Sequence, residues 1–263
     1  FLLGQMEMAF FNRTLLRIWT IALFASSPTI MQAGERAVSS QQLLIAVMVG
    51  DRTALAQLTE LANQHDTAAQ YYLATLYHDG TIVEKNFLKA SRLYQSAATK
   101  GLAGAQFSLA SMYAKGEGMP QDFAQAATWY KKAAIKGMDD AQFHLANMYA
   151  KGEGVPQDFA QAVLWYEKAA NQDHLAAQYA LGVSFYNGAG VAQDLIRAAE
   201  WFVRSAERGY AESQLILGLL YDNGKGVARD SSEAFRWYAK AAAQGNAAAQ
   251  FNVGLMYADG EGT

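Results

Sequence analysis

From residue 69 onward the sequence repeats itself every 36 residues, and this periodicity limits the possible folds more than any other feature. An Ala-Gln pair marks the repeat at Ala69-Gln70, Ala105-Gln106, Ala141-Gln142, Ala177-Gln178 and Ala249-Gln250, with Ser213-Gln214 at the remaining position. Tryptophan recurs at the same interval, at Trp129, Trp165, Trp201 and Trp237. A unit of this size cannot bury its own apolar face and has to stack on its neighbours. The pattern therefore predicts an elongated stack of repeats.

The residue spacing within one repeat predicts two helices joined by a short loop. Ala105, Leu109 and Tyr113 lie four residues apart, which places them on one face of a first helix. Gly116 is expected to end this helix, because glycine adopts the left-handed conformation at little cost. Asp122 is expected to cap the second helix by accepting hydrogen bonds from its backbone N–H groups. The repeating tryptophan lies on this second helix.

The same loop and cap residues recur along the chain, at Gly152, Gly188, Gly224 and Gly260 and at Asp158, Asp194 and Asp230. The combined pattern, A-x-x-x-L-[GA]-x-x-Y-x-x-G-x-G-V-x-x-D-x-x-x-A-x-x-W-Y-x-x-A-A-x-x-G, closely resembles the Sel-one-like repeat (SLR), a relative of the tetratricopeptide repeat. The resemblance covers Ala69 to Thr263. It implies an all-α fold, a right-handed α-solenoid of helix-turn-helix repeats with a superhelix like that of tetratricopeptide arrays.

Three segments follow from these patterns. Residues 1–33 contain upstream residues and a predicted signal peptide, and residues 34–66 form a degenerate helical cap with helices over Gln41–Val49 and Thr53–Asn63. Residues 67–263 form the repeat array, with about five full repeats and a truncated sixth. A capping unit is expected, because the terminal repeats of a solenoid must shield an otherwise exposed apolar face.

The N-terminal segment has the order of a secretory signal peptide. Arg13 and Arg17 precede an apolar run over residues 18–25, and small residues follow at Ala33-Gly34. The run is short for a bilayer span, and an uncleaved membrane anchor or a buried helix remain as alternatives. The chain contains no cysteine, which excludes disulfides and a lipid-modified cysteine. We expect a periplasmic or secreted protein without a stable membrane span once the signal is cleaved.

The patterns of several common active sites are absent. The net charge is only −3, and the charged residues are scattered along the chain without forming a basic stripe. This argues against nucleic acid as a partner. The glycine-rich loops lack the Gly-Lys-Ser/Thr of phosphate-binding loops, and the serines lack the Gly-x-Ser-x-Gly motif. No two of the four histidines have the i, i+4 spacing of a metal site. No catalytic, cofactor or metal residue is predicted, and the loop carboxylates Glu117, Glu153 and Glu261 are expected to be solvated.

A partner-binding surface is the remaining candidate. Phe107 and Ser111 lie off the face formed by Leu109 and Tyr113, and the resemblance to tetratricopeptide arrays implies that such positions line a concave groove that binds peptides. The predicted groove residues are Tyr71, Thr75, Phe107, Ser111, Lys115, Phe143, Asn147, Lys151, Tyr179, Val183, Leu215 and Leu219. The alternative is that the aromatic members only complete the packing between repeats.

The resemblance implies a non-catalytic scaffold or adaptor that binds a protein or peptide partner. The alternative is a cell-envelope enzyme or ligand-binding protein acting on peptidoglycan or β-lactams, because a cysteine-rich branch of the family has been linked to that activity. This chain lacks the cysteines of that branch. We therefore expect no enzymatic activity and no cofactor.

Overall fold

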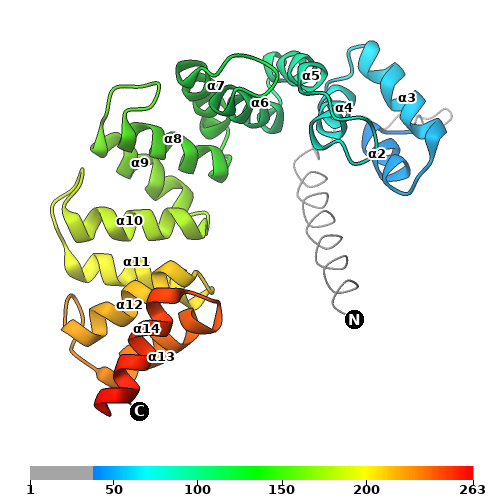
Figure 1. Ribbon diagram of the computed structural model, residues 1–263. Helices are drawn as coiled ribbons and strands as arrows, with labels where there is room; N and C mark the ends of the chain where they lie inside the picture. The colour runs from blue at the N-terminus through cyan, green and yellow to red at the C-terminus, as the bar shows by residue number, and fades with distance from the viewer. Residues whose placement is uncertain (1–37, 263) are drawn as a thin grey trace. The chain divides into compact units, whose positions relative to one another are not determined.

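The computed structural model describes residues 38–262, which form thirteen α-helices and no strand (Figure 1). Two short helices come first, α2 (Ser40–Met48) and α3 (Arg52–Asn63). Five helix pairs follow: α4 (Thr67–Asp79) with α5 (Phe87–Thr99), α6 (Ala103–Lys115) with α7 (Phe123–Ile135), α8 (Asp139–Lys151) with α9 (Phe159–Ala170), α10 (Leu175–Asn187) with α11 (Leu195–Glu207), and α12 (Ala211–Asn223) with α13 (Ser231–Ala243). The single helix α14 (Ala247–Asp259) comes last.

This architecture confirms the predicted all-α fold of paired helices with a 36-residue period. The predicted signal peptide at residues 1–33 lies outside the described residues. Within residues 38–262, none of the helices has the length and apolar character needed to cross a bilayer.

The residues that begin and end the helices act as the sequence predicts. Gly116 ends α6 in the left-handed conformation, with a φ of 71°. The Asp158 side chain accepts the backbone N–H of Gln161 at 2.9 Å and so caps α9. Asn86, which replaces the aspartate in the first repeat, caps α5 in the same way. These local bonds satisfy backbone groups that have no partner within the helix and fix each loop between its two helices.

The second glycine of the loop has a different role. A Cβ atom at Gly190 would collide with the backbone carbonyl of Phe159, the first residue of α9 in the preceding repeat. Gly226 approaches Leu195 at the start of α11 in the same way. The loop of one repeat therefore packs directly on the helix start of the repeat before it, which only glycine permits.

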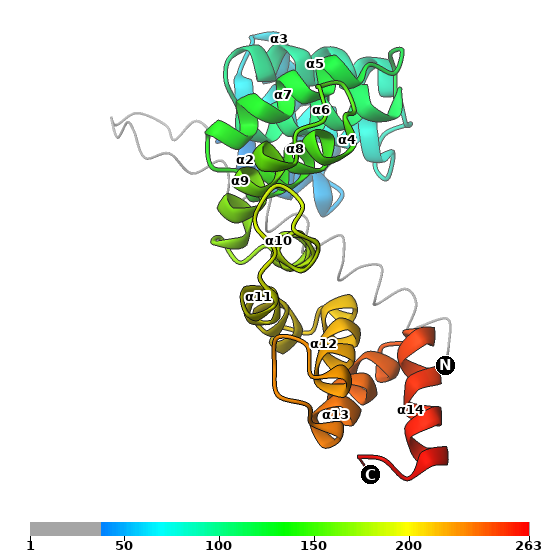
Figure 2. The same cartoon turned by 90° about the vertical axis from the view of Figure 1, so that its left-hand side faces the viewer.

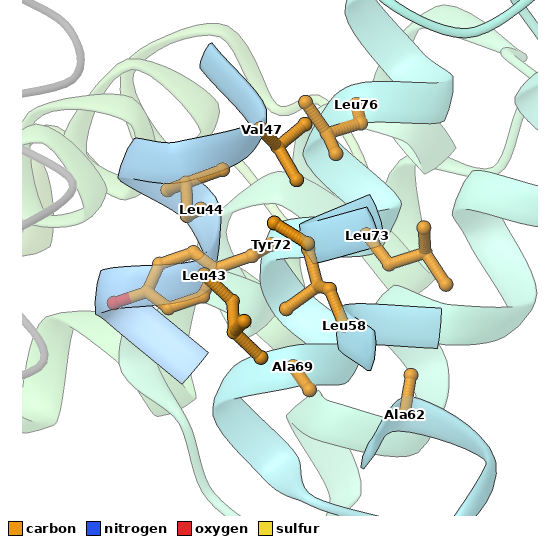
Figure 3. Packing of buried hydrophobic residues seen from close by; sticks show 10 residues of the cluster. Leu43, Leu44, Val47, Leu58, Ala62, Ala69, Tyr72, Leu73 and Leu76 are labelled. Carbon is orange, nitrogen blue, oxygen red and sulfur yellow. The ribbon is translucent and has the colours of Figure 1, made fainter. Parts of the chain in front are cut away.

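The chain consists of two compact units, residues up to Trp129 and residues from Tyr130 onward. In the first unit a core joins α2, α3 and α4, and Figure 3 shows Leu44, Leu58 and Tyr72 packed together there. Leu58 and Tyr72 are fully buried. The two short helices thus share one apolar core with the first repeat.

In the second unit the first and second helices of each repeat pack on one another, and each second helix packs on the next first helix (Figure 2). Trp165 of α9 is only 9% exposed, and the Lys168 ammonium lies 4.0 Å from the centroid of its ring. The pairs Arg204 with Trp201 and Lys240 with Trp237 repeat this arrangement. A cation over the indole face adds an electrostatic attraction to the burial of the ring.

Candidate partner-binding surface

The predicted groove residues all lie on first helices of repeats, in two rows. The Tyr71 row contains Tyr71, Phe107, Phe143, Tyr179 and Leu215, and the Thr75 row contains Thr75, Ser111, Asn147, Val183 and Leu219. We call the side of the first helices that carries both rows the first-helix face. Lys115 and Lys151 are the exposed last residues of α6 and α8.

The Tyr71 row packs between repeats. In the second unit the ring of Phe143 stacks on His174, with the ring centroids 4.7 Å apart. The rings of Tyr179 and Tyr210 are 5.6 Å apart. His174 and Tyr210 are the N-cap residues of the first helix in the following repeat. These contacts favour the alternative in which the aromatic side chains complete the inter-repeat packing.

In the first unit, Tyr71 shows the same behaviour. Its ring centroid lies 5.8 Å from that of Tyr94 on α5. A Cβ atom at Gly104, on α6, would lie 3.1 Å from its hydroxyl oxygen. Burial, more than the neighbouring Tyr72, raises the pKa of Tyr71 to about 12. Tyr71 is therefore a neutral packing residue between α4, α5 and α6.

Two polar members of the Thr75 row, Thr75 and Asn147, bond to the second helix of their own repeat. The Tyr166 hydroxyl donates to Asn147 Oδ1 at 2.7 Å, and the Tyr94 hydroxyl donates to Thr75 Oγ1 at 3.0 Å. Both tyrosines are buried, and burial raises the pKa of Tyr166 to about 12. Asn147 and Thr75 thus satisfy buried hydroxyl groups, in addition to any contact they make with a partner.

This pairing was not predicted from the sequence, although the sequence contains a signal for it. The two residues of each pair lie 19 positions apart. The same two positions of the fourth repeat hold Val183 and Phe202, neither of which can make the bond. In this repeat the hydroxyl and its acceptor are lost together, whereas the fifth repeat keeps Tyr238 opposite Leu219.

Toward the C-terminal end of the second unit the first-helix face becomes apolar and exposed. Leu219 is 37% exposed, and Leu255, at the corresponding position of α14, is 46% exposed. Lys151, earlier on this face, lies 3.9 Å from Glu153 in an exposed pair, and such pairs contribute little to stability. Exposed apolar side chains at recurring positions are typical of interaction sites.

The glutamine of each Ala-Gln pair has a role that the sequence analysis did not assign. Gln142 is buried; its Nε2 donates to the Ala134 carbonyl at 3.1 Å, and its Oε1 accepts from Gln172 Nε2 at 2.8 Å. The equivalent bonds to the preceding repeat run from Gln70 to Ala62, Gln106 to Ala98, Gln178 to Ala170, Gln214 to Ala206 and Gln250 to Ala242. The glutamine thus adds a second hydrogen bond to a carbonyl at the end of the second helix; the Ala134 carbonyl also accepts the Gly137 N–H at 3.0 Å.

The prediction that the loop carboxylates are solvated is wrong for Glu117. Its side chain is 25% exposed and lies 3.0 Å from Nε2 of His78, whose Nδ1 lies 3.2 Å from Asp79. The hydrogen bond to Asp79 and, more weakly, the one to Glu117 raise the pKa of His78 against the opposing effect of burial. His78 therefore links α4 to the loop of the next repeat.

The comparison with protein families decides the classification. The Sel1 repeat matches six consecutive segments, residues 67–102, 103–138, 139–174, 175–210, 211–246 and 247–263. The chain belongs to the Sel1 repeat family. The resemblance to Sel-one-like repeats is thereby confirmed, and each complete 36-residue segment contains one helix pair of the structure.

Two solved Sel1 repeat structures are similar to this chain. One is a protective antigen present in uropathogenic Escherichia coli strains, with an SLR fold; it is 38% identical, with a TM-score of 0.78 over 80% of this chain. The match spans only 45% of the antigen. The other is a Sel1 repeat protein from Oxalobacter formigenes, 30% identical with a TM-score of 0.76, covering 84% of this chain and 89% of that chain. Among curated proteins, none matches the chain.

Proposed function

We propose that this Sel1 repeat protein is an exported, non-catalytic scaffold that binds a protein or peptide partner on its first-helix face. The single observation that carries the proposal is a row of apolar side chains that continues from repeat to repeat. Val183, Leu219 and Leu255 occupy the same position of three successive repeats, and Leu219, whose repeat has both of its helices, is exposed. An extended or helical peptide can contact such a row with regularly spaced apolar side chains.

The second helices carry one row of apolar side chains, at Phe87, Phe123, Phe159 and Leu195, but the starts of α5, α9 and α11 pack there against a loop glycine of the following repeat. Their other exposed apolar side chains do not form a row. Leu164 on α9 is exposed, and the same position of the next repeat holds Glu200. Ile196 on α11 is exposed, and the same position of the repeat before it holds Ala160. Isolated exposed apolar residues are normal on a protein surface. The contrast favours the first-helix face.

Export rests on the order of basic, apolar and small residues at the N-terminus. That the related E. coli protein is a protective antigen agrees with this location. We propose a periplasmic or secreted protein.

The test is a pair of matched double variants in the second unit. Val183→Arg with Leu219→Arg places two charges on the proposed row, at side chains that cannot form hydrogen bonds. Leu164→Arg with Ile196→Arg places the same charges on the second helices. A pull-down from an envelope extract with the repeat array as bait should lose the partner with the first pair and retain it with the second. Melting temperatures should stay within a few degrees of the unmodified chain, because surface changes cost little.

Asn147 is unsuitable for this test, since its replacement would also remove the acceptor of the buried Tyr166 hydroxyl. The contradicting result would be that the Leu164/Ile196 variant loses the partner while the Val183/Leu219 variant retains it. The binding surface would then lie on the second helices.

A further inference from the structure

One titratable side chain, His78, joins the first repeat to the loop of the second. His78 lies on the last turn of α4, and Glu117 lies in the loop between α6 and α7. The Nε2 atom of His78 is 3.0 Å from Oε2 of Glu117, and its Nδ1 atom is 3.2 Å from Oδ1 of Asp79. All three residues belong to the first unit. Both nitrogens of the ring therefore face a carboxylate.

Only the protonated ring can make both hydrogen bonds. An imidazolium has an N–H group on each nitrogen, whereas a neutral imidazole has one N–H group and a lone pair on the other nitrogen. After deprotonation, one of the two carboxylates faces that lone pair and is repelled by it. The geometry thus couples a contact between two repeats to the protonation state of one side chain.

The aromatic rings of α5 hold the imidazole in place, and α5 packs on both α4 and α6 (Figure 1). The ring centroid of His78 lies 5.3 Å from that of Phe87 and 6.4 Å from that of Tyr94. Burial above all raises the pKa of Tyr94, so this phenol stays neutral. Lys85 brings a positive charge to the same place, with its Nζ atom 5.4 Å from the Phe87 ring centroid. The charges around His78 are thus two carboxylates and one ammonium group, a balance that favours the imidazolium.

These surroundings raise the pKa of His78 above its ordinary value. The hydrogen bond to Asp79 has the largest effect, burial of the ring opposes it, and Glu117 adds to it through its hydrogen bond and its charge. The stabilisation by His78 is complete below its unfolded pKa, about 6.5. It is lost as the pH rises through the higher pKa of the folded chain.

The arrangement is specific to this joint between repeats. In the later repeats the position of His78 holds no histidine but Ala114, Ala150, Tyr186 and Asp222. The glycine contact of the loop, in contrast, recurs: a Cβ atom at Gly118 would collide with the Phe87 carbonyl, as one at Gly190 would with that of Phe159. The loop of the second repeat thus has the usual contact, which does not depend on pH, and a second one that does.

We propose that His78 is a pH-sensitive switch between the first two repeats. In acidic solution its imidazolium holds Glu117, and with it the loop over residues 116–122, against α4. When the ring loses its proton, the contact with Glu117 is the one that breaks, because Asp79 is the next residue of the chain and stays beside the ring. Lys115, a predicted groove residue, directly precedes this loop. This inference does not rest on the proposed function, because the switch needs no partner.

The first measurement is the pKa of His78 in the full chain, followed by NMR of the histidine rings over a range of pH. The signal that is missing in His78→Gln identifies the residue. Glu117→Gln should lower the pKa of His78. The matched control is Glu153→Gln, at the same position of the next loop, where Ala114 replaces the histidine; it should leave that pKa unchanged. A His78 pKa at or below the ordinary value, or one that Glu117→Gln does not lower, would overturn the inference.

The second measurement is hydrogen exchange of residues 116–122, corrected for the intrinsic effect of pH on exchange. Protection in the unmodified chain should fall about two- to fivefold between about pH 6 and about pH 9, since a partly exposed ion pair contributes up to about 1 kcal/mol. His78→Gln and Glu117→Gln should each remove this step, whereas Glu153→Gln should keep it. Equal protection at both pH values in the unmodified chain, or the same step in both the His78 and Glu117 variants, would show that the loop does not respond to His78.

Discussion

At the scale of single residues, the tryptophan of the second helix is the largest side chain that recurs in four successive repeats. Trp165 is nearly buried, and Lys168 covers part of its ring. Trp165→Ala should lower the free energy of unfolding by roughly 3–5 kcal/mol, because it leaves a cavity beside tightly packed helices. Glu153→Gln, on the adjacent loop, should cost less than about 0.5 kcal/mol.

Denaturant titrations of the two variants measure this contrast, with circular dichroism as the signal. Equal losses of stability would show that the tryptophan contributes no more to the packing than a surface side chain, against the burial seen in the structure.

At the scale of helices, the glutamine bond between repeats is the contact that a hydrophobic pattern does not explain. Gln142 makes two hydrogen bonds, whereas the Oε1 of the equally buried Gln178 has no partner within the described chain. Gln142→Leu should therefore lower the free energy of unfolding by about 1–3 kcal/mol, since the Ala134 carbonyl keeps only its bond from the Gly137 N–H and the Gln172 amide loses the shorter of its two hydrogen bonds. Gln178→Leu should cost distinctly less, because it removes one bond and one unsatisfied atom.

Thermal unfolding of both variants, each compared with the unmodified chain, tests the difference. A larger loss for Gln178→Leu would mean that the second hydrogen bond of Gln142 contributes nothing and that the packing of the leucine decides the outcome.

At the scale of the whole molecule, the predicted export can be tested directly. A chain expressed from Met8 in a bacterium with two membranes should reach the periplasm or medium with its N-terminus near Gly34, because the basic, apolar and small-residue zones have the required order. Mass spectrometry of the purified protein determines the N-terminus. Cytoplasmic protein that retains Arg13 and Ile18 would show that the segment is not a signal peptide.

The repeat period, the helix pairs and the helix ends could be predicted from the sequence, because they depend on interactions within a few residues. Gly116 and Asp158 act on their own helix ends and so could be identified from spacing alone. The predicted groove residues lie on first helices, as expected from the sequence. The sequence did not show which of them are buried by packing between repeats and which are exposed. The bond of Tyr166 to Asn147 and the contact of His78 with Glu117 are visible only in the folded structure. Those contacts join positions 19 to 39 residues apart, and their distances depend on how the helices stack, which periodicity alone does not specify.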